Sequence, residues 1–173
     1  MAMSIYIDTH THLDFPDFDH DREAVLADCE RLGVRRLLLM GVTVDNWDRI
    51  WDLASGDERL YAAFGLHPVF LEQHRPEHLE QLRERLTRHL DHPRCCAVGE
   101  FGLDYFIQDA DREAQQQLFE AQLALAADFA LPVLLHVRRA HAPTIATLKR
   151  YRLARGGIIH AFSGSLEEAR EYI

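Results

Sequence analysis

Histidine side chains that could bind a metal ion follow the first apolar run of the sequence. His10 and His12 lie one residue apart, after the apolar residues 5–7. Alternate side chains of an extended chain point to the same face, so the two imidazoles could bind one ion. Taken alone, such a pair is interpreted equally well as two loop histidines. Its place at the end of an expected strand favours the metal.

A glutamate between two glycines is the second candidate. Glu100 follows the apolar run 95–98 and is flanked by Gly99 and Gly102. Glycines permit close approach of backbone or ligand, and a carboxylate at a strand end suits a bridge between two metals. The alternative for Glu100 alone is a solvated turn residue. For Asp104, an N-cap or a loop hydrogen-bond acceptor is at least as good an interpretation as a ligand.

Two more histidines end apolar runs further along the chain. His136 follows residues 133–135, and His160 follows residues 157–159. A lone histidine in such a place usually serves the core or a cap. Both nevertheless fall at strand ends like the others, and Arg138 lies two residues after His136, where it could bind a phosphate.

Two further positions suggest substrate contacts. His67, in the segment GLHP after residues 60–64, is expected to contact substrate rather than metal, and a structural turn role is nearly as well supported. Ser163 and Gly164 lead into an expected helix, whose first amides could bind an anion. Four strand ends that each carry a metal-type residue are unexpected by chance.

Short apolar runs alternate with helical patterns, which indicates a parallel α/β sheet with right-handed crossovers. The expected strands cover residues 5–9, 36–40, 60–64, 95–98, 133–135 and 157–159. Because candidate site residues recur at the carboxyl ends of many strands, we expect a TIM-type (β/α) barrel rather than an open sheet. A complete barrel needs roughly 250 residues. We therefore expect one hydrolase barrel domain over residues 1–173, truncated after about six strand–helix units, with its C-terminal strands missing.

Capping signals mark where the helices begin and end. Gly33 fits the position after a helix C-terminus, Asp45 an N-cap, and Pro76 a first helical residue. The longest helix is expected over residues 111–129, and another near Pro143. Ser165 and Glu168 have the spacing of a capping box, which predicts a last helix from there.

Composition and charge exclude some classes of protein. The net charge is −9, from 19 basic and 28 acidic residues, which argues against a broad nucleic-acid-coating face. The sequence contains no apolar stretch long enough to span a membrane, and residues 1–7 lack signal-peptide features. Three cysteines form neither a disulfide framework nor a zinc motif. These features predict a cytoplasmic protein without membrane contact.

Together, the motifs resemble the TatD family of metal-dependent deoxyribonucleases. The matching segments are IDTHTH at 7–12, GLHP at 65–68, GEFGLDY at 99–105, HVR at 136–138 and HAFSG at 160–164. They follow the family's order and rough spacing over nearly the whole chain. The resemblance implies a barrel of the amidohydrolase superfamily with two, sometimes three, divalent metal ions.

The resemblance also implies a role for each motif residue. By motif position, His10 and His12 bind the first metal. Glu100 bridges the two ions as the catalytic residue of this set, and His136 and His160 bind the second ion. In the family a further aspartate near the chain's end completes the first site and serves as general base, and no matching segment exists here.

The reaction that the resemblance implies is a 3′-5′ exodeoxyribonuclease cleavage of phosphodiester bonds with metal-activated water, at DNA 3′ ends. Two metals a few ångströms apart can stabilise both oxygens of an in-line displacement at phosphorus. Arg138 and the amides near Ser163 would hold phosphate oxygens, while His67, Tyr105 or Phe15 would contact the nucleotide. Histidine and carboxylate ligands leave zinc, magnesium and manganese open.

Two alternatives remain open. One is a metal-dependent phosphoesterase or amidohydrolase that acts on a small substrate; its carbamylated-lysine subtype is excluded, because Glu100 occupies that position and the only lysine, Lys149, falls in an expected helix. The other is an inactive truncated barrel, or one that folds only by dimerisation, since missing strands would leave open sheet edges and exposed apolar surface. The sequence does not fix the oligomeric state.

Overall fold

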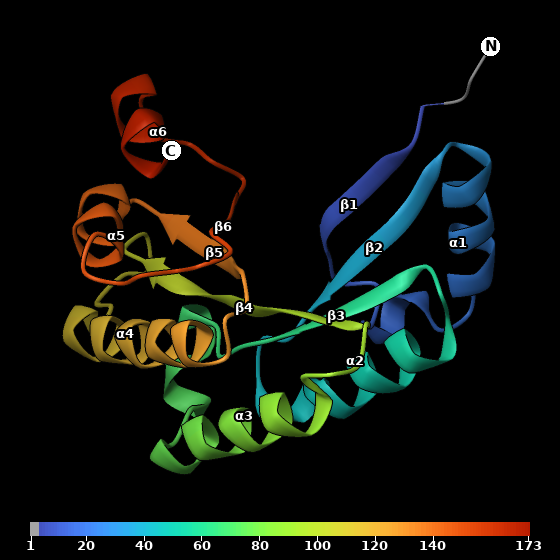
Figure 1. Ribbon diagram of the computed structural model, residues 1–173, viewed down its shortest axis with the longest axis horizontal. Coiled ribbons are helices and arrows are strands. Elements are labelled where there is room, and N and C mark those ends of the chain that lie inside the picture. Colours follow the sequence, from blue (N-terminus) through green and yellow to red (C-terminus); the bar gives the residue numbers. More distant parts are fainter. Residues whose placement is uncertain (1–3) are drawn as a thin grey trace.

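The computed structural model describes residues 4–173 as six parallel strands that alternate with helices. Each strand pairs in parallel with the next one along the chain, so the sheet order is β1-β2-β3-β4-β5-β6. The sheet curves into a barrel that stays open between β1 and β6, with the helices on its outer face (Figure 1). The strands are β1 (Tyr6–Thr11), β2 (Val34–Met40), β3 (Leu60–Phe64), β4 (Cys95–Asp104), β5 (Val133–Arg138) and β6 (Gly157–His160). The predicted barrel architecture is confirmed.

The helices lie between the strands, as the alternation of patterns predicts. They are α1 (Arg22–Arg31), α2 (Val44–Gly56), α3 (Pro76–His89), α4 (Arg112–Asp128), α5 (His141–Leu148) and α6 (Leu166–Tyr172), with two short 3₁₀ helices, η1 (Pro16–Phe18) and η2 (Pro68–Gln73), that the sequence did not predict. Pro76 opens α3, Asp111 caps α4, and Gly33 follows α1 with a φ of 92°. The capping box of Ser165 and Glu168 is also present.

One predicted helix start is wrong, and another lies close to its predicted place. The N-cap of α2 is Thr43, not Asp45, because the Asn46 side chain turns back and accepts the Thr43 N–H at 3.3 Å. Asp45 lies inside the first turn, where its charge favours the helix dipole. α5 begins at His141, so Pro143 stands third in the helix. The first turn tolerates proline there, because its N–H would have no partner within the helix.

Two apolar layers hold the sheet in place. The larger layer packs the sheet against the outer helices and contains the buried rings of Trp47, Phe64, Phe101 and Phe119. A smaller cluster inside the curve consists of Met40, Ala63, Ala97 and Leu134. Sheet residues therefore contribute to both layers, as expected for buried parallel strands.

The outermost strands, β1 and β6, are much more open to solvent. Tyr6 and Ile7 of β1 are 56% and 52% exposed, and Ile158 of β6 is 40% exposed. Within residues 4–173 neither strand has a second neighbour. The prediction for the N-terminal segment 1–7 falls partly on residues 1–3, which lie outside the described residues. Over the described part of the chain, no helix is long and apolar enough to cross a membrane.

Candidate metal centre

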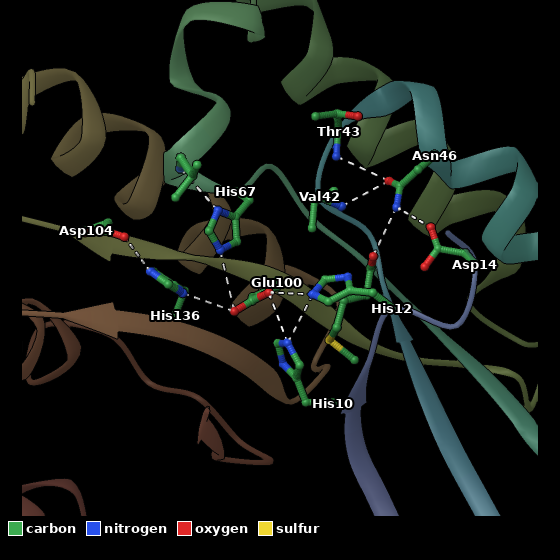
Figure 2. A network of polar contacts seen from close by, with 12 residues as sticks. His10, His12, Asp14, Val42, Thr43, Asn46, His67, Glu100, Asp104 and His136 are labelled. Atoms are coloured by element: carbon green, nitrogen blue, oxygen red, sulfur yellow. Dashed lines mark hydrogen bonds and ion pairs between the residues drawn. The ribbon is translucent and has the colours of Figure 1, made fainter. Parts of the chain in front are cut away.

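Glu100 lies at the centre of a histidine cluster at the carboxyl ends of the strands. Its side chain is buried, and its two oxygens face different partners (Figure 2). Oε2 is 3.5 Å from Nε2 of His10 and 3.8 Å from Nε2 of His12. Oε1 is 3.3 Å from Nδ1 of His136 and 3.6 Å from Nε2 of His67. The carboxylate thus separates a His10/His12 side from a His67/His136 side.

Gly102 brings the backbones of β4 and β5 close together beside this cluster. Its φ is 151°, and a β-carbon at this position would lie 2.0 Å from the carbonyl oxygen of His136. Only glycine fits such an approach. The sequence left open whether these glycines admit backbone or ligand; at Gly102 it is the backbone of β5. The resulting register places Gly102 opposite His136, two residues from Glu100.

The His10/His12 side has the spacing of a metal site. The two Nε2 atoms are 3.3 Å apart, and Nδ1 of His12 is buried without a hydrogen-bond partner among the described residues. Burial, reinforced by the neighbouring His160 and His12, lowers the pKa of His10 to about 4 despite the attraction of Glu100. At neutral pH His10 is therefore uncharged, as a metal ligand must be.

The separations between the candidate ligand atoms fit a bound ion. Metal–nitrogen bonds of about 2.0–2.1 Å in a tetrahedral site place the ligand atoms roughly 3.3 Å apart. The nitrogen and oxygen atoms of His10, His12 and Glu100 are 3.3, 3.5 and 3.8 Å apart. These three residues form one group with metal-ligand geometry, and His67, Glu100 and His136 form another. The described residues therefore include a group with metal-ligand spacing on each side of Glu100.

His136 is held by a second carboxylate. Its Nε2 lies 2.9 Å from Oδ2 of Asp104, which is buried and also accepts the Phe106 N–H at 2.9 Å. A proton on Nε2 leaves the Nδ1 lone pair directed toward Glu100. Carboxylates commonly orient metal-binding histidines in this way.

The charges around Glu100 follow from the same contacts. Burial would raise the pKa of Glu100, but the contacts with His136 and His67 outweigh it and hold the pKa well below its usual range. Burial would lower the pKa of His136, and the hydrogen bonds with Glu100 and Asp104 raise it instead. The two carboxylates thus favour positive charge at His136, in the place that a cation would take.

His67 occupies a different position in this cluster. Its Nδ1 accepts the Val69 N–H at 3.1 Å, and burial lowers its pKa. Neutral His67 therefore has its proton on Nε2, so the nitrogen nearest Glu100 has no lone pair for a metal. The distances from His67 to Glu100 and His136 match those of a metal group. The hydrogen bond from the Val69 N–H nevertheless favours the predicted substrate contact for His67 over a role as metal ligand.

The remaining predicted site residues lie at varying distances from Glu100. The His160 ring stacks on His10 with centroids 3.5 Å apart, but it belongs to neither group of metal-ligand spacing among the described residues. Arg138 and Tyr105 lie at the ends of β5 and β4, where the Tyr105 N–H donates to the Arg138 carbonyl at 2.9 Å. Ser163 is exposed, and the Ser165–Glu168 capping box occupies the start of the following helix. These roles remain predictions.

Two glutamines that the sequence did not single out position the strand ends. Gln122 accepts the Leu66 N–H at 2.8 Å and donates to the Leu66 carbonyl at 3.1 Å. Gln115 makes the same pair of bonds with the backbone of Asp104, at 2.8 and 3.1 Å. Both amides are buried on α4. Their seven-residue spacing, two helical turns on one face, was the available signal.

A barrel whose strand ends place histidines around a shared carboxylate is the arrangement expected of metal-dependent hydrolases. Residues 7–173 match the family model described as "TatD related DNase". The chain belongs to this family, and the resemblance of its motifs is confirmed.

Relatives within the family are similar over nearly all of this chain. A protein of Escherichia coli K12, "Uncharacterized metal-dependent hydrolase YjjV", is 44% identical over 97% of this chain and 64% of its own length. Its crystal structure superposes with a TM-score of 0.92 over 96% of this chain and 64% of that one. A "3'-5' ssDNA/RNA exonuclease TatD" from Cronobacter turicensis is 35% identical over 89% of this chain and 57% of its own length. The chain therefore spans somewhat less than two thirds of the relatives' length.

Proposed function

We propose that the protein is a metal-dependent hydrolase that cleaves phosphodiester bonds of nucleic acid, as a 3′-5′ exonuclease acting on DNA 3′ ends. The observation that carries the proposal is the position of Glu100, whose two oxygens face separate histidine groups at ligand spacing. The family, and a relative named as an exonuclease, support this choice of substrate. Residues 1–173 would be part of one barrel domain.

The metal ligands in this proposal come from both sides of Glu100. His10 and His12 would hold one divalent ion through Nε2, and His136 would hold a second through Nδ1, with Glu100 shared. His160, which stacks on His10, would complete the second set after a rotation of its ring. When bound, such a pair of ions lowers the pKa of water and neutralises charge on phosphate oxygens.

The protein's own side chains would bind and orient the substrate. His67 presents an Nε2–H beside Glu100, which can donate to a phosphate or a leaving oxygen. Asp104 keeps His136 in one orientation, so that its lone pair faces the shared carboxylate. Arg138, Tyr105 and Ser163 are proposed as outer contacts to the nucleotide.

The test is release of mononucleotides from 3′-labelled and 5′-labelled single-stranded DNA by full-length protein with Mg²⁺, Mn²⁺ or Zn²⁺. We expect stepwise loss of nucleotides from the 3′ end and no activity after chelation. A small phosphodiester such as bis(p-nitrophenyl) phosphate serves as the parallel substrate. Cleavage of the small ester without action on DNA would contradict the nuclease proposal and support the small-substrate alternative.

A further inference from the structure

Three arginines stack on two adjacent aromatic rings next to the metal centre. The guanidinium carbon of Arg138 lies 3.7 Å from the centroid of the Phe106 ring, and that of Arg139 lies 4.6 Å from the same ring. Arg112 lies 4.6 Å from the ring of Tyr105. We call these five residues the arginine–aromatic cluster. It joins the end of β4 to the end of β5.

The guanidinium groups of this cluster are free to bind a ligand. Within residues 4–173, Arg112, Arg138 and Arg139 make no ion pair and no side-chain hydrogen bond, and all three are exposed. Phe106 is 46% exposed. Stacking against a ring holds a guanidinium flat while its N–H groups in the plane remain available to phosphate oxygens.

The backbone ties this cluster to the metal centre. The Phe106 N–H donates to Asp104, the carboxylate that holds His136. Arg138 stands opposite Asp104 in the β4–β5 register. The cluster thus begins with Tyr105, the residue after Asp104, which contacts the proposed metal ligand His136. A chain of phosphates that leaves the metal centre over this edge meets positive charge, on a protein whose net charge is −9.

We infer that the arginine–aromatic cluster binds the single strand beside the scissile phosphate, with guanidinium groups on its neighbouring phosphates and the exposed Phe106 edge against a base. Aromatic side chains combined with arginine are typical of surfaces that bind single strands without reading sequence. The inference rests on the proposed function and adds to it the residues that distinguish a polynucleotide from a small phosphodiester.

The experiment measures binding by metal-loaded full-length protein of a fluorescent ten-nucleotide oligothymidylate with phosphorothioate links at its 3′ end. Arg139→Gln removes one charge from an exposed position, and Phe106→Leu removes the ring. We expect each to raise the Kd roughly 5- to 20-fold. Arg139→Gln should also reduce the slope of log K against log salt by about 0.7, the contribution of one phosphate contact on a single strand. Phe106→Leu should leave that slope unchanged.

The matched control is Arg94→Gln. Arg94 also stacks on an aromatic ring, that of Tyr61 at 4.8 Å, but it precedes β4 at the opposite end of the strands. Arg94→Gln removes the same charge as Arg139→Gln and should leave both the Kd and the salt slope at the wild-type values. Thermal unfolding of each variant verifies that it is folded.

Failure of the inference and failure of the proposed function give different results. If wild-type protein binds and cleaves the oligonucleotide while Arg139→Gln and Phe106→Leu keep its Kd and salt slope, the cluster is structural and the inference is overturned. If wild-type protein hydrolyses only bis(p-nitrophenyl) phosphate and binds no oligonucleotide, the nuclease proposal fails and the inference fails with it. Equal affinity for a duplex of the same sequence would overturn the preference for single strands.

Discussion

The two sides of Glu100 differ in how firmly their histidines are held. On the His67/His136 side, each imidazole has an outer partner: the Val69 N–H for one and the Asp104 carboxylate for the other. On the His10/His12 side, Nδ1 of His12 is buried without a partner among the described residues, and His10 stacks on His160. One half of the centre is thus oriented by the protein alone, whereas the other offers converging lone pairs that a cation would order. Glu100 is therefore shared between two unlike halves: the His67/His136 half is oriented before metal binds, and the His10/His12 half depends on the metal for its order.

The largest effect is expected from Glu100→Gln, because this change removes the group that both halves share. Each metal ion contributes several kcal/mol to the stabilisation of the transition state, so turnover should fall about a thousandfold or more. Metal content, measured by mass spectrometry of the dialysed protein, should fall on both sides. Circular dichroism should show an unchanged fold. Retention of both ions would contradict the bridging role.

Removing one histidine from each side tests whether the halves are separable. His12→Asn should abolish the ion of the His10/His12 side and leave the other, and His136→Asn should do the reverse. Each change removes one proposed ligand and leaves the remaining ones in place. Spectroscopy of cobalt-substituted protein can distinguish the two sites. Loss of both ions in either variant would show that the halves bind metal only as a unit.

A smaller effect is expected when the outer carboxylate is changed. Asp104→Asn keeps an oxygen near Nε2 of His136 and loses the charge that orients the ring. Metal affinity on the His136 side should fall about 10- to 100-fold, the usual effect of such outer partners. Affinity on the His10/His12 side should stay the same in an equilibrium metal titration. An equal loss on both sides would contradict the assignment of Asp104 to one half.

The smallest effect is a difference in pH dependence between the halves. The pKa of His136 is raised by its two carboxylates, and that of His10 is lowered to about 4 by burial. Protons therefore compete with metal for His136 at a higher pH than for His10, since only the unprotonated ring binds. As pH falls from 7 toward 5, the ion beside His136 should dissociate first. Release in the opposite order would contradict this prediction.

The sequence predicted the parts of the site that depend on the ends of apolar runs. The apolar runs 60–64 and 133–135 predict buried strands. In a parallel barrel all strands end at the same rim, so the polar side chains that follow these runs lie at that rim. The first residue of a helix was harder to predict. Thr43 and Asp45 both suit an N-cap, and only the position of the Asn46 side chain decides between them.

Pairings across the barrel could not be predicted from spacing. Asp104 and His136 are 32 residues apart, and their contact depends on the register that Gly102 permits. The stack of His10 on His160 joins the first strand to the sixth, so it depends on the curvature of the whole sheet. The hydrogen bond from Val69 to His67 is local, but it requires the unpredicted helix η2.

The two glutamines of α4 have a consequence for how the site responds to change elsewhere. Gln122 fixes the segment that carries His67, and Gln115 fixes Asp104, which in turn holds His136. Both histidines that face Oε1 of Glu100 are therefore positioned through one helix. A displacement of α4 along its axis would move the two segments together and preserve their mutual distance. His10 and His12, at the end of β1, have no such attachment to α4 among the described hydrogen bonds. Substitutions on the outer face of α4 would therefore change the distance between the two halves of the centre while each half stays intact.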